Sequence, residues 1–428
     1  MRKTGALLAL GHLIPLVCGS VWGQNLVIAN ARIIDGNGGV IDSGAIFVQE
    51  GRIASVSADP ADAGGAQVID AGGLTVMPGF IDAHRHVISG DPDRWLAEQA
   101  VPRMREFLEA GFTTVLSAGD DLDAILELRR QLDEGEISGP RLIVSGRAPL
   151  AQSTGGFTPG IDPARIDISR PPHRPTEPAP GIPHEQTRAR IQQLADAGVD
   201  AIKTVIIVTP DGPEQETLSV IAGEAERLGI PSITHAVTVM DTVAAVEAGT
   251  HVLVHTPHIG QLDEDTAQMI ADSGIPMMST LGIFVPAFAA DNAIIRDRTG
   301  MDNVPRFRDL DPFPMDTISS AGQGPVNARM LWDAGIVYGF GTDTRFLPRD
   351  SLFHELKPLH LVFSAEDIVT IMSRNAAIAI GRLDELGTVE AGKLADLVIL
   401  DGDPLDDPYD LLNVSMVIKG GEIMVDNR

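Results

Sequence analysis

The chain has 428 residues, of which 44% are hydrophobic and 21% are charged, a composition that excludes a disordered chain and a fibrous repeat. Acidic residues outnumber basic ones by 59 to 32, which gives a formal net charge of −27 at pH 7. Nucleic acids and anionic membrane surfaces both select basic protein surfaces, so we expect neither as a partner of the folded chain.

Residues 1–23 have the pattern of a signal peptide. Arg2 and Lys3 give a positively charged start, and residues 6–17 are mostly apolar. The apolar run is short for a membrane span, and a permanent N-terminal anchor is the alternative. We predict an exported protein, periplasmic or secreted, with no stable membrane association after cleavage. Cleavage would also remove Cys18, the single cysteine of the chain.

Residues 24–78 and 387–428 have the same sequence pattern, short β-rich runs separated by turns. Residues 26–28 and 397–400 are examples of such runs, and Gly-containing pairs stand between them. The same pattern at both ends of the chain predicts one small β-sandwich domain that is built from both termini.

Residues 79–386 alternate apolar, strand-like runs with amphipathic helical runs, which is the pattern of a parallel sheet. The predicted strands lie at 74–81, 113–117, 141–145, 201–208, 232–235, 252–255, 275–278 and 337–341. The predicted helices lie at 94–110, 121–135, 185–198, 214–229, 239–249, 263–273, 323–335 and 365–381. Strands and helices in such alternation predict an α/β fold, a (β/α)8 TIM barrel, with an open doubly wound sheet as the alternative.

Two connections between the predicted strands are long. Residues 147–184 follow the third strand, and residues 282–321 follow the seventh. Long loops after barrel strands lie on the catalytic face, so we expect both to shape a substrate pocket. For the Pro-rich residues 171–183, a disordered insertion is the alternative.

The segment 78–86 ends an apolar strand with the pattern His-x-His. Residues two apart in a strand face the same side, so His84 and His86 should project together while Arg85 points away. Two imidazoles from one strand end can bind one metal ion of the zinc type. This strand end is therefore a candidate metal site.

Four further groups stand at or near the ends of predicted strands: Lys203, His235, His255 and Asp343. Each has a structural explanation when taken alone, as an ion-paired lysine, a hydrogen-bonded core histidine or a helix-capping aspartate. Lys203 lies in an apolar run that disfavours its ammonium form, and a neutral amine can add carbon dioxide to give a carbamate that could bridge two cations. Because barrel strand ends converge on one mouth, we favour a shared metal centre.

The order His-x-His, Lys, His, His, Asp resembles the metal-dependent amidohydrolase superfamily, and more narrowly its imidazolonepropionase-like and Xaa-Pro dipeptidase-like branch. Residues 30–36, 50–53 and 387–398 are also similar, so the resemblance spans nearly all of the mature chain. It implies a (β/α)8 barrel with two divalent metal ions, which we expect to be zinc. One ion would be held by His84, His86 and Asp343 and the other by His235 and His255, with carbamylated Lys203 and a hydroxide bridging them.

The resemblance also implies that Asp343 is catalytic, because it could take the proton of the attacking water and pass it to the leaving nitrogen. The chain departs from the dipeptidase-like pattern at Phe157, where a histidine often follows Thr-Gly-Gly. Phe157 favours an apolar or aromatic part of the substrate. Arg147 and Arg345 follow predicted strand ends and are candidate contacts to an anionic substrate group, with surface salt bridges as the alternative.

We therefore predict a dinuclear metal-dependent hydrolase that cleaves a C–N amide bond with a metal-bridging hydroxide. Its substrate would be an N-acyl amino acid or a peptide-like amide, and the chain would form a homo-oligomer. A lactonase, a cyclic-amide hydrolase and a phosphotriesterase-like enzyme are alternatives that would use the same metal centre. A catalytically silent barrel that serves as a scaffold is a further alternative from another class.

Overall fold

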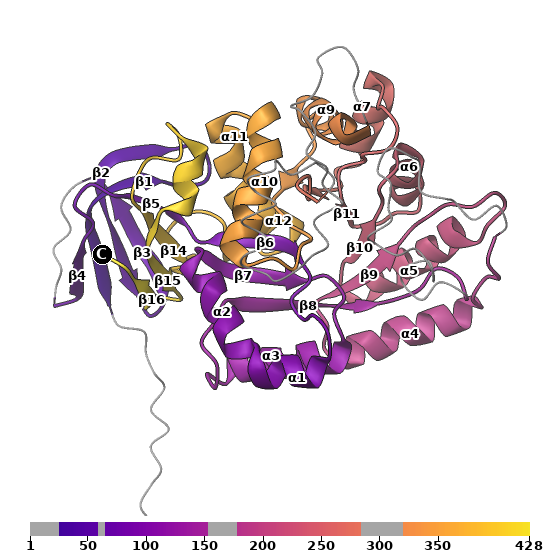
Figure 1. Ribbon diagram of the computed structural model, residues 1–428, viewed down its shortest axis with the longest axis horizontal. Helices are drawn as coiled ribbons and strands as arrows, with labels where there is room; N and C mark the ends of the chain where they lie inside the picture. The colour runs from indigo at the N-terminus through magenta and orange to yellow at the C-terminus, as the bar shows by residue number, and fades with distance from the viewer. Residues whose placement is uncertain (1–24, 59–64, 153–177, 284–319) are drawn as a thin grey trace, which may run out of the picture.

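A computed structural model describes residues 25–58, 65–152, 178–283 and 320–428. Parallel strands form the central sheet in the order in which they occur along the chain, from β6 to β13 (Figure 1). They are β6 (Phe80–Arg85), β7 (Phe112–Ser117), β8 (Arg141–Arg147), β9 (Ala201–Val205), β10 (Ser232–His235), β11 (Val252–Val254), β12 (Met277–Met278) and β13 (Tyr338–Gly339). The predicted (β/α)8 barrel is confirmed.

Backbone hydrogen bonds between β6 and the segment after β13 close this sheet into a barrel. The Ala83 N–H donates to the Phe340 carbonyl at 3.0 Å, and the Asp343 N–H donates to the His84 carbonyl at 2.8 Å. Gly341 permits this approach, because a Cβ there would lie 2.9 Å from the His84 Cβ and 3.2 Å from its backbone nitrogen. The closure places the residues around Asp343 beside the strand that carries His84.

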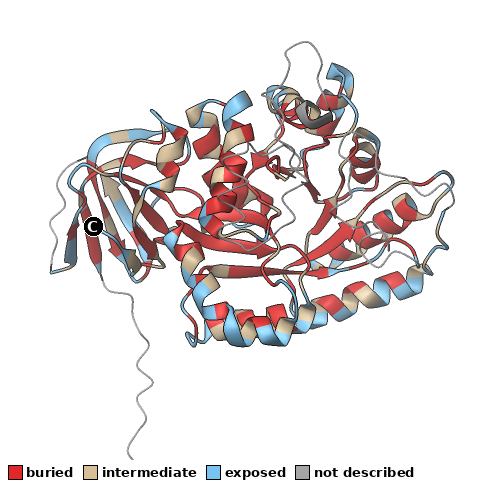
Figure 2. Cartoon of the chain, viewed as in Figure 1, coloured by how far each residue is buried: buried red, intermediate tan, exposed pale blue. Residues whose placement is uncertain are grey.

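Helices cover the outside of the barrel, so its strands are shielded from water on both faces and appear almost wholly buried in Figure 2. The helices are α1 (Pro92–Glu98), α2 (Ala100–Glu109), α3 (Leu122–Asp133), α4 (His184–Asp196), α5 (Glu214–Leu228), α6 (Val239–Glu247), α7 (Glu264–Asp272), α9 (Ser320–Ala334), α10 (Pro348–Val362), α11 (Ala365–Thr370) and α12 (Ala376–Ala379). In α3 the apolar face is clear, because Ile125 and Leu128 are fully buried while Asp123 and Asp133 are exposed.

A second sheet combines strands from both ends of the chain, as predicted (Figure 1). Its strands are β1 (Leu26–Ile34), β2 (Val40–Gln49), β3 (Arg52–Ser57), β4 (Gln67–Asp70), β5 (Thr75–Pro78), β14 (Leu397–Leu400), β15 (Val414–Lys419) and β16 (Glu422–Asp426). β5 pairs in parallel with β1 and antiparallel with β14, and this pairing joins the two ends of the chain. Ile28 and Leu397 are fully buried in one hydrophobic cluster.

The predicted first barrel strand, residues 74–81, is in fact two strands in different sheets. β5 belongs to the second sheet, and β6 begins the barrel immediately after Gly79. A Cβ at Gly79 would lie 2.4 Å from the Thr113 hydroxyl oxygen, so the chain can cross between the sheets here because this residue has no side chain.

The sequence pattern missed α10 and joined α11 and α12 into one helix. α10 contains Pro358, which lacks a backbone donor and ordinarily interrupts a helix. Its buried face also includes polar residues such as Ser351 and Glu355, which obscure the amphipathic pattern. Between α11 and α12 the chain forms a short π-helix, Ile371–Asn375, and a 3-10 helix, Pro408–Leu412, precedes β15.

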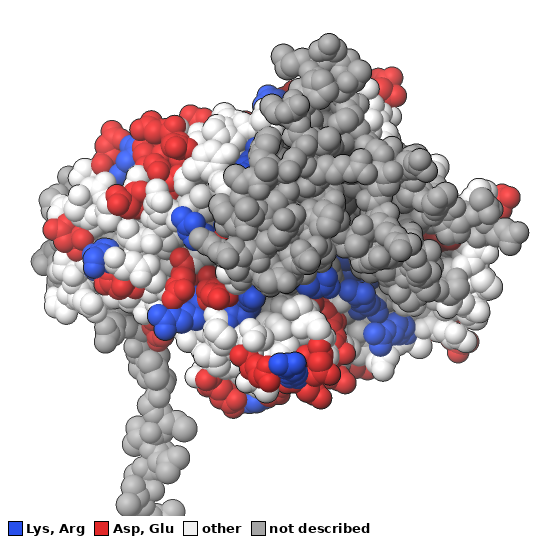
Figure 3. Space-filling model, in the orientation of Figure 1, with Lys and Arg blue, Asp and Glu red and all other residues white. Residues whose placement is uncertain are grey.

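On the face seen in Figure 3, acidic and basic side chains are intermingled over the described surface. Within the described ranges, every helix is too short or too polar to cross a lipid bilayer. The predicted signal peptide, residues 1–23, lies outside the described residues. The expected export and the expected homo-oligomer therefore stay predictions.

Gly341→Ala should destabilise the chain, because the new methyl group would press on the backbone and Cβ of His84. We expect a loss of about 1–3 kcal/mol in the free energy of unfolding, the usual cost of forcing an extra carbon into a packed site. Denaturant unfolding measures it. Gly223→Ala in α5 is the matched control, because its Cβ would meet no atom within 4 Å. A helix gains stability from this change, so equal effects of the two substitutions would contradict the account.

Candidate metal centre

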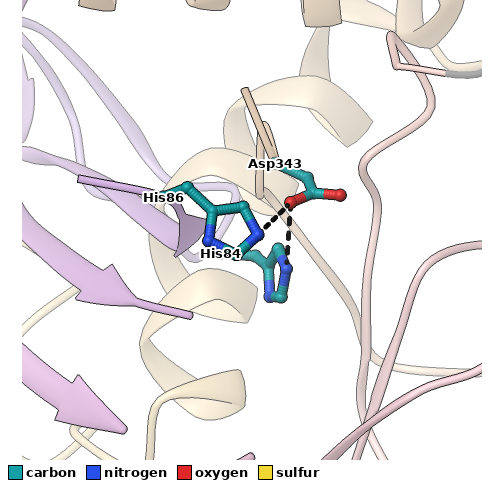
Figure 4. A group of neighbouring side chains, drawn as sticks. All are labelled: His84, His86 and Asp343. Carbon is teal, nitrogen blue, oxygen red and sulfur yellow. Dashed lines mark ion pairs between the residues drawn. The ribbon is translucent and has the colours of Figure 1, made fainter. Parts of the chain in front are cut away.

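His84 in β6 and His86 directly after it face the carboxylate of Asp343 (Figure 4). The Asp343 Oδ1 atom lies 3.4 Å from His84 Nε2 and 3.1 Å from His86 Nε2. Among the described residues, these are the three that offer possible ligand atoms within 4.8 Å of one another. The two-residue repeat of the strand brings both imidazoles to one side, and the closure of the barrel brings the carboxylate to them.

His235 ends β10 and His255 directly follows β11, so both stand at the same mouth of the barrel. His235 Nδ1 and His255 Nε2 are 2.6 Å apart. The His255 Nε2 atom also lies 3.8 Å from Asp343 Oδ2, and the His255 ring centre lies 5.3 Å from that of His84. Asp343 therefore lies next to both predicted histidine pairs.

Lys203 lies in β9, and the residue is only 5% exposed. Its Nζ atom has no hydrogen-bond partner in the described part of the chain. Burial lowers the pKa of Lys203 to about 7, with the charge of Asp343 opposing the shift. A substantial share of this amine is therefore neutral at neutral pH, which is the form that can react with carbon dioxide.

His84, His235 and His255 are held in their neutral form, whereas Asp120 and Asp343 outweigh burial and raise the pKa of His86. Burial, and then the charge of Lys203, lowers the pKa of His84 to about 3 and that of His235 well below its usual value. Burial acts in the same direction on the pKa of His255. Neutral imidazoles keep a bare nitrogen, which metal binding requires.

Asp343 is held in its ionised form by His84 and His86. Burial alone would raise the pKa of Asp343, but His84 and His86 outweigh it and hold this pKa well below its usual range. The Oδ1 atom of Asp343 is buried and lacks a hydrogen-bond donor among the described residues. A buried anionic oxygen and neutral imidazoles form a donor set that fits divalent cations of the zinc type.

Polar groups of β6 fix the backbone on both sides of Asp343. Arg85, which points away from the histidines, donates to the hydroxyl oxygens of Thr342 and Thr344 at 3.0 and 2.9 Å. Asp82 accepts from the Thr342 N–H at 3.0 Å and from its hydroxyl at 2.7 Å. Asp343 itself has a left-handed backbone with φ of 50°, which is uncommon for a residue with a side chain. These buried bonds stabilise that conformation.

Two acidic residues near the site were missed by the sequence analysis. Asp120 follows β7, and its Oδ1 lies 3.8 Å from His86 Nδ1. Its position directly after the second predicted strand was a usable signal. Glu355 accepts hydrogen bonds from the Ser279 hydroxyl and from the backbone N–H groups of Leu281 and Gly282. No sequence signal marked Glu355, because it stands in the helix α10, which the sequence pattern did not predict.

The predicted substrate contacts are only partly described. Phe157 lies outside the described residues. Arg147 ends β8, and its guanidinium donates to the Gly119 carbonyl. Burial lowers the pKa of Arg147, and the charges of Asp120, Arg345 and Asp343 also act on it, so these groups are near one another. Arg345 is exposed and stands two residues after Asp343.

Comparisons with known proteins agree with this geometry. The model of the amidohydrolase family matches residues 75–424. An imidazolonepropionase of Rhizobium rhizogenes is 26% identical over 406 residues, which cover 86% of this chain and 90% of that protein. Two solved structures share the fold, a prolidase in complex with N-methylphosphonate-L-proline and the ochratoxinase of A. niger. The prolidase is 24% identical with a TM-score of 0.71, covering 94% of this chain and 100% of its own. The ochratoxinase is 20% identical with a TM-score of 0.71, covering 94% of this chain and 96% of its own.

Glu355→Gln should make the stability of the chain less dependent on pH. Burial raises the pKa of Glu355 from 4.5 to about 8. Between these two values the folded chain keeps the proton that the unfolded chain has lost, so stability falls as pH rises through this window. Glutamine cannot ionise, so its contribution to stability does not change with pH. The wild type should therefore lose its advantage in the free energy of unfolding over the variant as the pH rises from 5 to 8.

Denaturant unfolding at pH 5, 6, 7 and 8 measures this difference. The exposed residue Glu366 of α11 provides the control, and Glu366→Gln should follow the wild-type curve. A difference between Glu355→Gln and the wild type that stays constant over the range would show that Glu355 is already ionised at pH 5.

Proposed function

This chain belongs to the amidohydrolase family, and we propose that it is an exported dinuclear metallohydrolase that cleaves the amide bond of a small anionic substrate. Its membership identifies a metal-dependent hydrolase that acts on C–N bonds. The proposal adds the second metal ion, the carbamate on Lys203, the role of Asp343 and the substrate class, an N-acyl amino acid or a peptide-like amide.

One observation carries the proposal: six polar side chains, all buried or nearly so, gather at one mouth from β6, β9, β10, β11 and the segment after β13. Lys203 Nζ and Asp343 Oδ1 are buried without a hydrogen-bond partner among the described residues, which is unfavourable, and a barrel whose only task was to fold would have no need of these two groups there. Neutral imidazoles, an ionised carboxylate and a lysine with a lowered pKa are the forms in which these groups bind cations or carbon dioxide.

We assign His84, His86 and Asp343 to one ion, His235 and His255 to the other, and carbamylated Lys203 to both. When bound, two divalent cations would lower the pKa of water and polarise the scissile carbonyl. Asp343 would accept the proton of the attacking water and deliver it to the leaving nitrogen, because its carboxylate is ionised and stands between the two histidine pairs. Arg85 and Asp82 would keep that carboxylate in place through Thr342.

The substrate class follows from the cations at the rim. Arg147 ends β8 opposite Lys203 of β9, and Arg345 stands two residues after Asp343; the two arginines are close enough for their charges to interact. A substrate carboxylate would pair with this positive charge, which the net charge of −27 makes unusual on this chain. An N-acyl amino acid and a peptide-like amide both have such a carboxylate.

Lys203→Ala should remove both the bound metal and the activity. Without the carbamate the remaining ligands lose their shared anion, so we expect hydrolysis of an N-acyl amino acid to fall about 100-fold or more. Elemental analysis and a hydrolysis assay on the same preparation measure the two effects. Lys393→Ala is the control, because this lysine pairs with Glu390 at 3.2 Å outside the barrel mouth. Wild-type metal content and activity in Lys203→Ala would overturn the proposal.

Arg345→Ala should raise KM for an N-acyl amino acid about tenfold and leave kcat nearly unchanged, because it removes a charge contact made equally in the ground and transition states. The same substrate with its carboxylate converted to a primary amide should show no such increase. Arg349→Ala, at another exposed arginine only four residues away, should behave as the wild type. Equal effects on the charged and the uncharged substrate would refute the role of Arg345.

A panel of amides, lactones and phosphotriesters, assayed with the wild-type protein, separates the proposed activity from its alternatives. We expect the anionic amides to have the highest kcat/KM. A preference for lactones or phosphotriesters would retain the metal centre and reject the proposed substrate class.

A further inference from the structure

The turn after β12 places a threonine hydroxyl against His255. The Thr280 Oγ1 atom lies 2.6 Å from His255 Nδ1, and both residues are almost completely buried. The other nitrogen of the same ring, Nε2, lies 2.6 Å from His235 Nδ1 and 3.8 Å from Asp343 Oδ2. The imidazole thus has one nitrogen directed at Thr280 and the other directed into the group of proposed metal ligands.

Thr280 is held in a conformation that threonine rarely adopts. Its φ is 46°, in the left-handed region that β-branched residues avoid because of steric clashes. Its own N–H donates to the Gly341 carbonyl at 3.1 Å, in the segment that leads to Asp343. Such strain persists only where the surroundings enforce it, and it is commonly found at functional sites.

Glu355 of α10 holds the backbone around Thr280 in this conformation through hydrogen bonds. Its side-chain oxygens accept from the Ser279 hydroxyl at 2.6 Å, from the Leu281 N–H at 2.8 Å and from the Gly282 N–H at 2.6 Å. These three bonds surround Thr280 on both sides in the sequence. The turn is therefore fixed by a buried side chain of α10, while Thr280 itself makes the contact with His255.

A neutral imidazole has one N–H and one bare nitrogen, and the hydrogen bond to one nitrogen determines the state of the other. If Thr280 accepts the N–H of Nδ1, the bare Nε2 faces His235 and Asp343. If the tautomer were reversed, the N–H would point at the position where a ligand atom is needed.

We propose that Thr280 is a positioning residue for the metal centre: its hydroxyl accepts the Nδ1–H of His255 and so presents the bare Nε2 of that ring to a metal ion. The inference rests on the proposed dinuclear function, because it assigns Thr280 to the ion held by His235 and His255. Groups that orient a metal-binding histidine in this way typically change metal affinity 10–100-fold when they are removed.

Thr280→Val tests the role of the hydroxyl, because valine keeps the β-branch and therefore the backbone strain. Thr280→Ser restores the hydroxyl. Thr75→Val makes the same chemical change at a buried threonine of β5, which donates to the Gly402 carbonyl at 2.6 Å in the other sheet. Each metal-free protein is titrated with zinc against a competing chelator, and bound zinc is counted by elemental analysis.

We expect Thr280→Val to bind one of its two zinc ions about 10–100-fold more weakly, with the other ion unaffected. Thr280→Ser and Thr75→Val should match the wild type. Wild-type affinity for both ions in Thr280→Val would overturn the proposal. An equal loss in Thr75→Val would show a general effect of destabilisation and would overturn it as well.

A second measurement does not depend on metal binding. In metal-free protein labelled with ¹⁵N-histidine, long-range ¹H–¹⁵N correlation spectra show which ring nitrogen has the proton, and the His255→Gln variant assigns the signal. We expect His255 to be protonated at Nδ1 in the wild type and to lose this preference in Thr280→Val. Protonation at Nε2 in the wild type would refute the role of Thr280.

These two experiments separate failure of the inference from failure of the proposed function. If the wild type binds fewer than two zinc ions, the dinuclear proposal is wrong, and the tautomer of His255 still decides whether Thr280 positions the ring. If the wild type binds two ions and the tautomer is reversed, the dinuclear proposal stands and the role of Thr280 is rejected.

Discussion

The site depends on one constraint, the closure of a parallel barrel between β6 and the segment that follows β13. Parallel strands present all their carboxyl ends at one mouth, but the first and last strands meet there only if the sheet closes. In this chain closure requires the Asp343 N–H to reach the His84 carbonyl and requires a glycine at position 341. The same hydrogen bonds that complete the barrel therefore place a carboxylate beside two imidazoles.

This closure gathers buried polar groups that the barrel alone does not satisfy. Lys203 Nζ and Asp343 Oδ1 lack hydrogen-bond partners among the described residues, and a buried unsatisfied polar group costs about 1–3 kcal/mol. Around this group, β6 contributes Asp82 and Arg85, and α10 contributes Glu355, all with well-formed hydrogen bonds. Asp82, Arg85 and Glu355 thus hold the residues around the centre by hydrogen bonds, whereas Lys203 Nζ and Asp343 Oδ1 remain for bound cations to complete.

Much of this architecture could be predicted from the sequence, because apolar runs and helical periodicity report burial directly. Strand ends were located well enough to place Lys203 and His255 at a common mouth. The positions of Thr280 and Glu355 could not be predicted, because a left-handed turn and the hydrogen bonds around it arise only from tertiary packing. α10 was not predicted because it contains Pro358, a residue that ordinarily interrupts a helix. The change of sheet between β5 and β6 was not predicted because it occurs at a single residue, Gly79, within one apolar run. Phe157 and the export of the chain remain predictions.

The central claim is that six side chains hold two divalent cations at the barrel mouth. Crystals of zinc-loaded protein, with diffraction recorded above and below the zinc absorption edge, test it directly. The account predicts two anomalous peaks, one beside His84, His86 and Asp343 and the other beside His235 and His255, with density for a carbamate on Lys203. An empty mouth, or zinc bound only at other residues, would contradict the account.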